Sequence, residues 1–581
     1  MKRISFIVII SLFSCIANAQ NDKDWRNIEN AISIIPDEKY CDQPYVVVAN
    51  NSDWVCVLTT GPGTESQKGQ HIVASISSDK GSTWSPLIDI EHSSASSSSW
   101  AIPYITLYGR IYVFYDFNGD DINTLDEEPL KHNTELGWYC YKYSDDNGRT
   151  WSERYRLPMK KTTIDYINPW SGEVQLFWGV SKPITVGKSM YFAFTKMAVH
   201  PQDMGEGWFY KSDNINTEKN PEKLNWEQLP DGDDGLFETS LGITQEEHNI
   251  VSLRNNDLYC MFRTTEGYPA ESYSRDGGHT WSVPVFARDR DGRVIKNPRA
   301  CPRLFKCSNG NYLLWYHNNN VKGYVGYRNP AWVLGGVEKN GRIEWSQPEI
   351  LLYGGLKDKM SYPDLIEVAG SYWVTETQKE VARVHAINPE LLKGLWNQAS
   401  DKTITRKGLI WERKSISNKR RFSSLDLPGL ADGSFSIELL LNVKELILGQ
   451  IILDNTDSKG NGLSIRVTPK RTIGLSLKDG EVTSTWDTDP GVVKPGKQHI
   501  VFVVDGKANL LTTIVNGKLC DGGRYRVTGW DWFDAKINNI NGSRNLIVLS
   551  DYNVKINKIR IYNRYLTTSE AISNYHGELG Q

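Results

Sequence analysis

Short runs in which apolar and polar residues alternate recur along the whole chain, with turn-forming residues between them. Clear examples are residues 71–76, 138–143 and 270–273, and each of them leads into a segment rich in Ser, Asp and Gly. Alternation with a period of two residues is typical of a half-buried β-strand, and such a segment between two strands is typical of a hairpin turn. The pattern therefore predicts a protein built mainly from short strands joined by tight turns.

One turn sequence, Ser-x-Asp-x-Gly-x-Thr-Trp, occurs three times, at residues 77–84, 144–151 and 274–281. Weaker copies lie near residues 212–226 and 341–345. The Asp caps backbone amides of the turn, and the Gly supplies a positive φ. The serines that begin the first four copies, Ser77, Ser144, Ser212 and Ser274, are 67, 68 and 62 residues apart.

A repeat of this regularity indicates the blades of a β-propeller, in which each sheet packs only against its neighbours. The five hairpins and a last unit near residues 362–385 give six repeats. The sequence therefore predicts an all-β, six-bladed propeller. We expect the strand near residues 45–48 to complete the last blade.

The repeated turns resemble the Asp boxes of the sialidase-like, BNR-repeat family of six-bladed propellers. The resemblance covers about residues 27–400 and implies a catalytic propeller domain over that range. Asp boxes lie on the outer rim of such propellers, so they indicate the fold more strongly than the chemistry.

The chain after residue 400 has a different pattern. It has no further Asp box, and short alternating strands such as residues 435–441 and 500–504 follow one another. The final segment, residues 559–572, resembles the last strand and short helix of a laminin-G or concanavalin-like jelly roll. We expect a β-sandwich over residues 408–581, which either binds glycan and adds avidity or serves as a structural appendage docked on the propeller.

The first 19 residues are typical of a secretory signal peptide. Two basic residues precede an apolar stretch, and Ala17-Asn18-Ala19 provides a small-x-small cleavage site. We expect a secreted or periplasmic protein. Cys15 follows Leu12-Phe13-Ser14, which resembles a bacterial lipoprotein cleavage box, so a lipid anchor at Cys15 is the alternative.

The composition narrows the function classes. Lys and Arg total 66 against 69 Asp and Glu, a net charge of -3 that argues against nucleic-acid binding. No apolar run after the leader is long enough to span a membrane. The 20 Trp and 28 Tyr suit a protein that stacks sugar rings. We expect an oligosaccharide or polysaccharide partner, no cofactor, no metal, and cysteines that are buried free thiols.

The resemblance also implies site residues. In the sialidases of this family three arginines hold the substrate carboxylate, since planar guanidinium groups match a carboxylate with two hydrogen bonds. Arg263 and Arg328 match two of these arginines. Tyr362 matches the nucleophile, Glu247 matches the base that takes the phenolic proton, and Glu376 matches a Glu that closes the last blade and orients an arginine.

Two departures from the family pattern put the substrate in question. The first arginine is missing, because Cys41-Asp42-Gln43-Pro44 stands where the family has Arg-Ile-Pro. The early loop, residues 60–71, has no Asp, so we expect Glu65 or His71 to transfer protons. Sialic acid, another acidic sugar, or a neutral sugar whose hydroxyls contact Asp42 and Gln43 all stay open as substrates.

Our main hypothesis is a glycoside hydrolase that cleaves a terminal glycosidic bond. One rival is a polysaccharide lyase on the same scaffold, in which His71, His248 and Tyr362 abstract a proton next to a uronate carboxyl that Arg263 neutralises. The other rival is a non-catalytic glycan-binding propeller. For Arg303, a substrate contact and a structural ion pair are equally compatible with the sequence.

Overall fold

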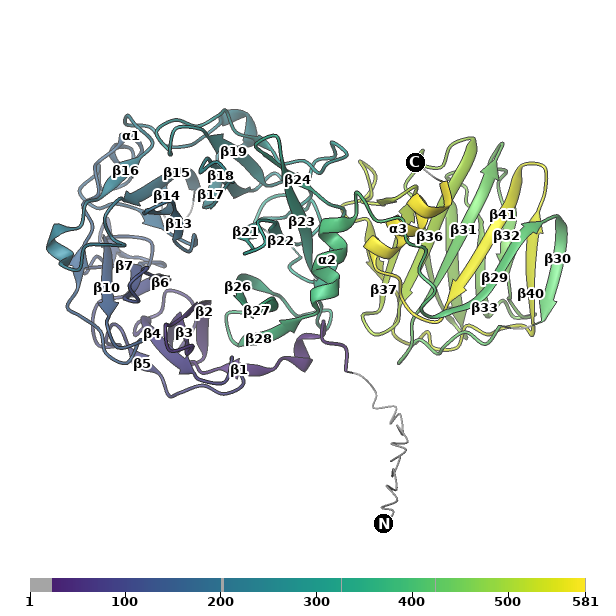
Figure 1. The fold of residues 1–581 in the computed structure, drawn as a ribbon, viewed down its shortest axis with the longest axis horizontal. Coiled ribbons are helices and arrows are strands. Elements are labelled where there is room, and N and C mark those ends of the chain that lie inside the picture. The colour runs from purple at the N-terminus through teal and green to yellow at the C-terminus, as the bar shows by residue number, and fades with distance from the viewer. Residues whose placement is uncertain (1–22, 200–202, 325–326, 424, 580–581) are drawn as a thin grey trace, which may run out of the picture.

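The computed structural model describes residues 23–199, 203–324, 327–423 and 425–579. The predicted signal peptide and Cys15 lie outside these residues. The described chain forms a ring of six antiparallel sheets followed by a sandwich of two sheets (Figure 1), which confirms the predicted fold class. In the described part, no helix has the length and apolar character needed to cross a membrane.

The first three sheets of the ring follow one another along the chain. The first contains β2 (Tyr40–Val48), β3 (Trp54–Gly61), β4 (His71–Ser77) and β5 (Ile88–Asp89). The second contains β6 (Ser98–Ile105), β7 (Ile111–Phe117), β10 (Trp138–Ser144) and β11 (Tyr155–Arg156), with the small ribbon β8 (Thr124–Leu125) and β9 (Glu128–Pro129) beyond it. The third contains β12 (Phe177–Trp178), β13 (Ile184–Val186), β14 (Ser189–Val199), β15 (Asp203–Ser212) and β16 (Glu227–Leu229).

Three further sheets close the ring. The fourth contains β17 (Gln245–Ser252), β18 (Leu258–Thr264), β19 (Ala270–Ser274) and β20 (Val285–Phe286). The fifth contains β21 (Arg303–Lys306), β22 (Tyr312–Tyr316), β23 (Ala331–Lys339), β24 (Arg342–Trp345) and β25 (Glu349–Leu352). The sixth contains β26 (Ser361–Val368), β27 (Ser371–Thr377), β28 (Ala382–Ile387) and β1 (Ser33–Ile35).

Strand β1 completes the sixth sheet, and this corrects one prediction. Ser33, Ile34 and Ile35 pair with β28, so the two ends of the ring are joined by backbone hydrogen bonds. Residues 45–48, expected in this place, belong to β2 of the first sheet instead. The apolar run at 45–48 is typical of any buried strand, and its pairing partner is decided by the closure of the ring.

The predicted Asp boxes form the turns between the third and fourth strands of their sheets. In the turn after β19, the Asp276 carboxylate accepts hydrogen bonds from the Thr280 amide at 3.0 Å and from the Thr280 hydroxyl at 2.6 Å. Gly278 has a φ of 98° and donates its amide to the Ser274 hydroxyl. A side chain at this φ would strain the turn, which is why the repeat keeps a Gly there.

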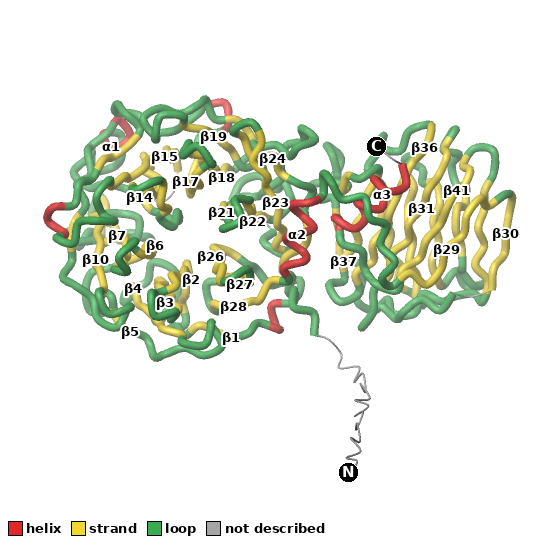
Figure 2. Tube along the Cα trace, viewed as in Figure 1, coloured by secondary structure: helices red, strands yellow, loops and turns green. Residues whose placement is uncertain are grey.

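Short helices lie at the rim of the ring and beside the sandwich (Figure 2). They are η1 (Ile28–Asn30), α1 (Thr163–Tyr166), η2 (Pro221–Lys223), η3 (Thr239–Leu241), α2 (Pro389–Asn397) and α3 (Thr568–Leu579). Helix α2 packs on β23 and contacts α3, so it lies at the junction of the two parts (Figure 1).

The sandwich buries one continuous apolar core between its two sheets. One sheet has the order β29 (Leu409–Ile416), β41 (Val554–Tyr562), β31 (Phe435–Val443), β36 (Gly496–Asp505), β37 (Leu510–Val515) and β38 (Lys518–Leu519), and β39 (Trp530–Trp532) also pairs with β37. The other has the order β30 (Asn418–Ser423), β40 (Asn545–Ser550), β32 (Ile451–Asp454), β33 (Gly462–Val467), β34 (Ile473–Asp479) and β35 (Val482–Asp487). The seven cysteines of the described chain are buried free thiols, as expected.

Ring closure by β1 generates a stability prediction. Ile35 is fully buried in the apolar cluster between the first and last sheets, whereas its neighbour Ile34 is 63% exposed. We expect Ile35→Ala to lower the free energy of unfolding by about 2–4 kcal/mol, because the change removes buried methylene groups and leaves a cavity. Ile34→Ala is the matched control, with an expected change below about 0.5 kcal/mol. Equal effects of the two variants in chemical unfolding would refute the role of β1.

Candidate active site

The innermost strands of four sheets carry the same irregularity. The pairing of β2, β6, β17 and β26 with the next strand slips by a β-bulge. Each bulge places one residue in the left-handed region of φ, at values from 45° to 59°; these residues are Gln43, Trp100, Glu247 and Tyr362. A bulge turns a side chain away from the regular alternation. The bulge therefore changes the direction of one side chain at the equivalent place in each of four sheets.

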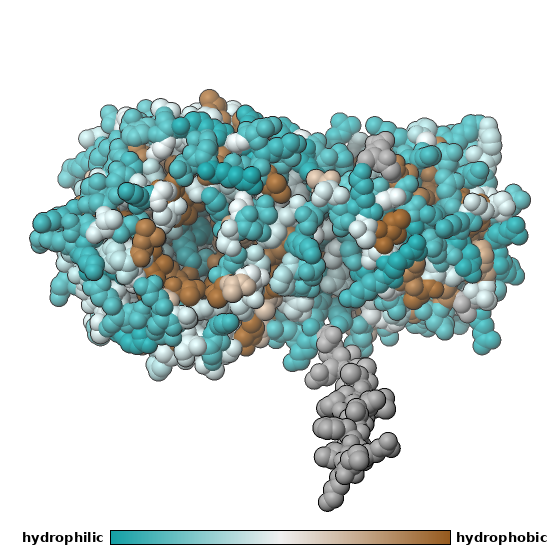
Figure 3. Space-filling model, viewed as in Figure 1, coloured by the Kyte–Doolittle hydropathy of each residue, from teal (hydrophilic) through white to brown (hydrophobic). Residues whose placement is uncertain are grey.

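Three of these four residues line a pocket of about 440 Å³. The space-filling view shows the centre of the ring hollowed (Figure 3). The pocket is lined by Glu65, Trp100, Trp178, Glu247, Arg263, Arg299, Tyr324, Arg328, Lys359, Ser361, Tyr362, Gln378 and Lys379. Five of these side chains are cationic and two are carboxylates, so the pocket favours an anionic ligand.

Tyr362 and Glu247 form a direct pair inside the pocket. The Tyr362 hydroxyl donates a hydrogen bond of 2.8 Å to Glu247 Oε1, across 115 residues of sequence. Burial, followed by the negative charge of Glu247, raises the pKa of Tyr362 well above its ordinary value. The phenol is therefore neutral, and Glu247 is placed to take its proton if the oxygen attacks an electrophile.

Arg263 holds Glu247 in this position. One end of its guanidinium lies 2.5 Å from Glu247 Oε1, and the other end lies 2.5 Å from Glu246 Oε2. All three side chains are buried. Two carboxylates on successive residues face the same cation because the bulge at Glu247 breaks the alternation of β17. Arg263 thus neutralises two buried carboxylates, and their charge raises its own pKa against the effect of burial.

Arg299 and Arg328 form a second cationic group in the pocket. Arg299 lies 3.0 Å from Glu246 and stacks over the ring of Tyr324 at 4.6 Å. Arg328 donates hydrogen bonds to the Ser361 hydroxyl at 2.9 Å and to the backbone oxygen of Arg299 at 3.0 Å. Neither bond of Arg328 goes to a carboxylate, so its charge is available to a ligand.

Lys379 forms the third charged group. Its ammonium lies 2.7 Å from Glu65, 3.2 Å from Asp42 and 5.2 Å from the ring centre of Tyr362. Burial alone would raise the pKa of Glu65, but the nearby Lys379 outweighs burial and lowers it. Asp42 is fully buried, and there burial outweighs Lys379 and raises the pKa. Glu65 is therefore an ionised group at the pocket wall, in reach of a ligand.

Comparison with protein families identifies the two parts of the chain. The BNR repeat-like domain family matches residues 108–374, and the concanavalin A-like lectin/glucanases superfamily matches residues 419–571. The chain is a BNR repeat-like propeller followed by a concanavalin-like domain. No curated protein matches the sequence.

Solved structures with a similar fold include sialidases, at low sequence identity. The Trypanosoma rangeli sialidase in complex with sialic acid is 13% identical, with a TM-score of 0.43 over 92% of this chain and 93% of that chain. The Hadza microbial sialidase Hz136 is 17% identical, with a TM-score of 0.44 over 61% of this chain and 66% of that one. The Ruminococcus gnavus intramolecular trans-sialidase is 14% identical, with a TM-score of 0.45 over 63% and 99%.

The BNR repeat-like propeller brings together five residues that we expected at the site, namely Tyr362, Glu247, Glu65, Arg263 and Arg328. Asp42 lies directly behind this group, on Lys379. Gln43 donates its side-chain amide to the backbone oxygen of Gly179 and is fully buried. Neither Asp42 nor Gln43 lines the pocket.

Four expected residues lie elsewhere in the propeller. His71, at the start of β4, hydrogen-bonds the backbone oxygen of Gly69. His248 points away from the pocket, because the residue after a bulge returns to the opposite face; it bonds Thr195 and stacks on Phe262. Glu376 is paired with Arg383 and His385. Arg303 lies over the ring of Tyr45. The ion pair that the sequence left open for Arg303 is not formed among the described residues.

The pocket also contains residues that were not singled out as site residues from the sequence, among them Lys379, Arg299 and Trp100. Lys379 lies two residues after the end of β27, and Arg299 lies in the loop before β21, so both basic residues are close to the end of a strand. A basic residue close to a strand end is the sequence signal that could have led to Lys379 and Arg299. Their common cavity appears only when distant sheets meet at the axis.

The environment of His248 generates a prediction about acid stability. Complete burial lowers its pKa to about 3, whereas an unfolded chain protonates the residue near pH 6.5. In this pH range the unfolded state therefore binds a proton at His248 that the folded state does not bind. The free energy of unfolding falls as the pH drops from 6.5 towards 3. We expect His248→Gln to make the free energy of unfolding depend less on pH between 6 and 4. The same change at exposed His92 is the control, and an identical pH slope in His248→Gln and wild type would contradict this account.

Proposed function

We propose that this protein is a glycoside hydrolase that removes a terminal acidic sugar from a glycan. The observation that supports this most directly is the Tyr362–Glu247 hydrogen bond of 2.8 Å in a pocket where five cationic side chains outnumber two carboxylates. A neutral phenol suits attack on a sugar that carries a carboxylate, because a carboxylate nucleophile would be repelled by the substrate.

In the first step, the Tyr362 oxygen attacks the anomeric carbon while its proton passes to Glu247. The glycosidic bond breaks, and the leaving oxygen takes a proton from Glu65. In the second step, Glu65 removes a proton from a water molecule that attacks the same carbon. The bond to Tyr362 then breaks, and Glu247 returns the proton to the phenolic oxygen, so both residues end as they began.

Glu65 must be protonated in the first step, and the bound substrate favours this protonation. Lys379 keeps Glu65 ionised when the pocket is empty. A substrate carboxylate close to these residues adds a negative charge and competes for Lys379. Both effects raise the pKa of Glu65 and favour its acid form only when an anionic substrate is bound.

The arrangement of charges also favours an acidic sugar over a neutral one. Arg263 is occupied by two carboxylates, whereas among the described residues Arg328 donates its side-chain hydrogen bonds to a hydroxyl and a backbone oxygen. A substrate anion would therefore give Arg328 a carboxylate partner. Of the four residues named for the lyase hypothesis, His71 and His248 do not line the pocket that contains Tyr362 and Arg263, which favours the hydrolase.

The mature protein is to be tested against sialylated, uronate-containing and neutral oligosaccharides, with products analysed by mass spectrometry. We expect release of an acidic monosaccharide by hydrolysis. We expect Tyr362→Phe to lower kcat by at least about a thousandfold with little change in substrate binding or melting temperature, because only the nucleophilic oxygen is lost.

Tyr372→Phe is the matched control, since Tyr372 lies in the same blade, on β27, and does not line the pocket. Unchanged turnover in Tyr362→Phe would remove this residue from the mechanism. A product lighter by one water molecule would establish a lyase instead, and binding without any product would establish a glycan-binding propeller.

The fork-shaped guanidinium of Arg328 generates a separate prediction. We expect Arg328→Lys to raise KM for the acidic substrate about tenfold with a smaller change in kcat, because the positive charge stays but the bidentate contact is lost. Arg342→Lys, a change of the same kind at an exposed residue of β24, is the control and should leave both constants unchanged. An unchanged KM in Arg328→Lys would show that the substrate anion does not bind this residue.

A further inference from the structure

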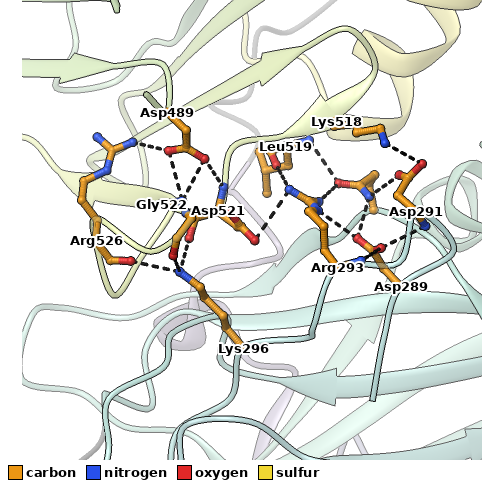
Figure 4. Close-up of polar contacts among 12 residues, drawn as sticks. Asp289, Asp291, Arg293, Lys296, Asp489, Lys518, Leu519, Asp521, Gly522 and Arg526 are labelled. Carbon is orange, nitrogen blue, oxygen red and sulfur yellow. Dashed lines mark hydrogen bonds and ion pairs between the residues drawn. The ribbon is translucent and has the colours of Figure 1, made fainter. Parts of the chain in front are cut away.

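Among the contacts between the sandwich and the propeller, one is made by a loop, residues 521–526, and the short strand that follows it. Figure 4 shows this loop between charged side chains of both parts. Lys296 of the propeller is 5% exposed and donates hydrogen bonds to three backbone oxygens of the loop: Asp521 at 2.6 Å, Gly523 at 2.8 Å and Arg526 at 2.9 Å. A buried ammonium with all three of its donors used holds the loop at a defined distance.

The loop is held from the sandwich side as well. The buried carboxylate of Asp489 accepts hydrogen bonds from the amides of Asp521 and Gly522, and Arg526 pairs with the same carboxylate at 2.6 Å. The loop therefore moves with the sandwich, and Lys296 attaches it to the propeller (Figure 4).

The residues after the loop extend this contact along the propeller. The backbone oxygen of Val527 accepts the amide of Asn320 at 3.1 Å, and Thr528 forms an isolated β-bridge with Asn319. The indole of Trp530 is 2% exposed and donates to the backbone oxygen of Asn318 at 2.9 Å. Three successive propeller residues are thus fastened to one short segment of the sandwich.

These three residues begin the segment that brings Tyr324 and Arg328 to the pocket. The Asn319 side chain donates to the backbone oxygen of Tyr327 at 2.9 Å, directly before Arg328. Lys296 itself lies three residues before Arg299, whose backbone oxygen accepts the Arg328 guanidinium. Both segments that supply the second cationic group of the pocket are therefore anchored where the sandwich docks.

We propose that the sandwich is a positioning partner of the pocket: docking through Lys296 and Trp530 holds the segments that present Arg299, Tyr324 and Arg328 to the substrate. This role rests on the proposed function, but its structural part is independent of it. The role differs from a separate glycan-binding module, which would add avidity without affecting the geometry of the propeller.

Two variants test the proposal in the full chain. Lys296→Met keeps the length and apolar stem of the side chain and removes the ammonium. Trp530→Phe keeps an aromatic ring and removes the bond to Asn318. Lys518→Met is the matched control, because Lys518 pairs with Asp291 at 3.0 Å at the same junction, yet no contact of Lys518 with the 318–328 segment is present among the described residues.

We expect both test variants to increase amide hydrogen exchange at least about tenfold in peptides that cover residues 317–324, because opening of this segment becomes easier. We also expect them to raise KM for the acidic substrate at least about fivefold with kcat within about twofold. The Lys518→Met variant should match wild type in both measurements. A melting temperature for each variant verifies that the chain is folded at the temperature used.

Unchanged exchange and unchanged KM in Trp530→Phe and Lys296→Met would overturn the proposal. Increased exchange with unchanged KM would also overturn it, because the segment would then be loosened without any consequence for the pocket. If the wild-type protein releases no product from any glycan, the proposed hydrolase activity is refuted. Hydrogen exchange in the two variants then still tests whether docking of the sandwich holds residues 317–324. If Lys296→Met does not fold, Trp530→Phe gives the decision.

Discussion

The closure of six sheets into a ring is the constraint on which the site depends. Closure brings the innermost strand of each sheet to a common axis, where side chains from Glu65 to Lys379 share one pocket. A regular strand would present alternate residues to the axis and to the neighbouring sheet. The bulges at Glu247 and Tyr362 break this alternation, at the energetic cost of a left-handed backbone at a non-glycine residue. Part of the backbone strain of the propeller therefore lies where the chemistry is proposed.

Charge compensation at the axis then orders the side chains. Arg263 pairs with Glu246 and Glu247, and Lys379 pairs with Asp42 and Glu65, so the acids closest to the pocket already have cationic partners. A buried carboxylate without such a partner would lose its charge. What remains for a ligand is the cationic group around Arg328, which is why we propose an anionic ligand although the whole chain is slightly acidic.

The sandwich also contributes to the position of the pocket residues. Its docking loop is fastened by a buried lysine, and the strand after the loop supports the backbone that leads to Arg328. A loop that must carry a guanidinium into a pocket is long and needs external support, because its own backbone groups have few partners. The second domain provides this support, which explains why the two parts meet at the fifth sheet beside that segment (Figure 1).

Local sequence was sufficient for the turns and the repeat, because Asp-box geometry depends on bonds within five residues, such as Asp276 to Thr280. The same repeat predicted six blades, and the family resemblance led to Tyr362, Glu247 and Arg263. Local sequence was not sufficient to predict pairing between distant strands, because β1 closes the ring and residues 45–48 do not. The bulge that separates Glu247 from His248, and the meeting of Lys379 with Glu65 across 314 residues, are decided by tertiary packing alone. Local bonds determine turns, whereas contacts at the axis exist only after the whole ring has formed.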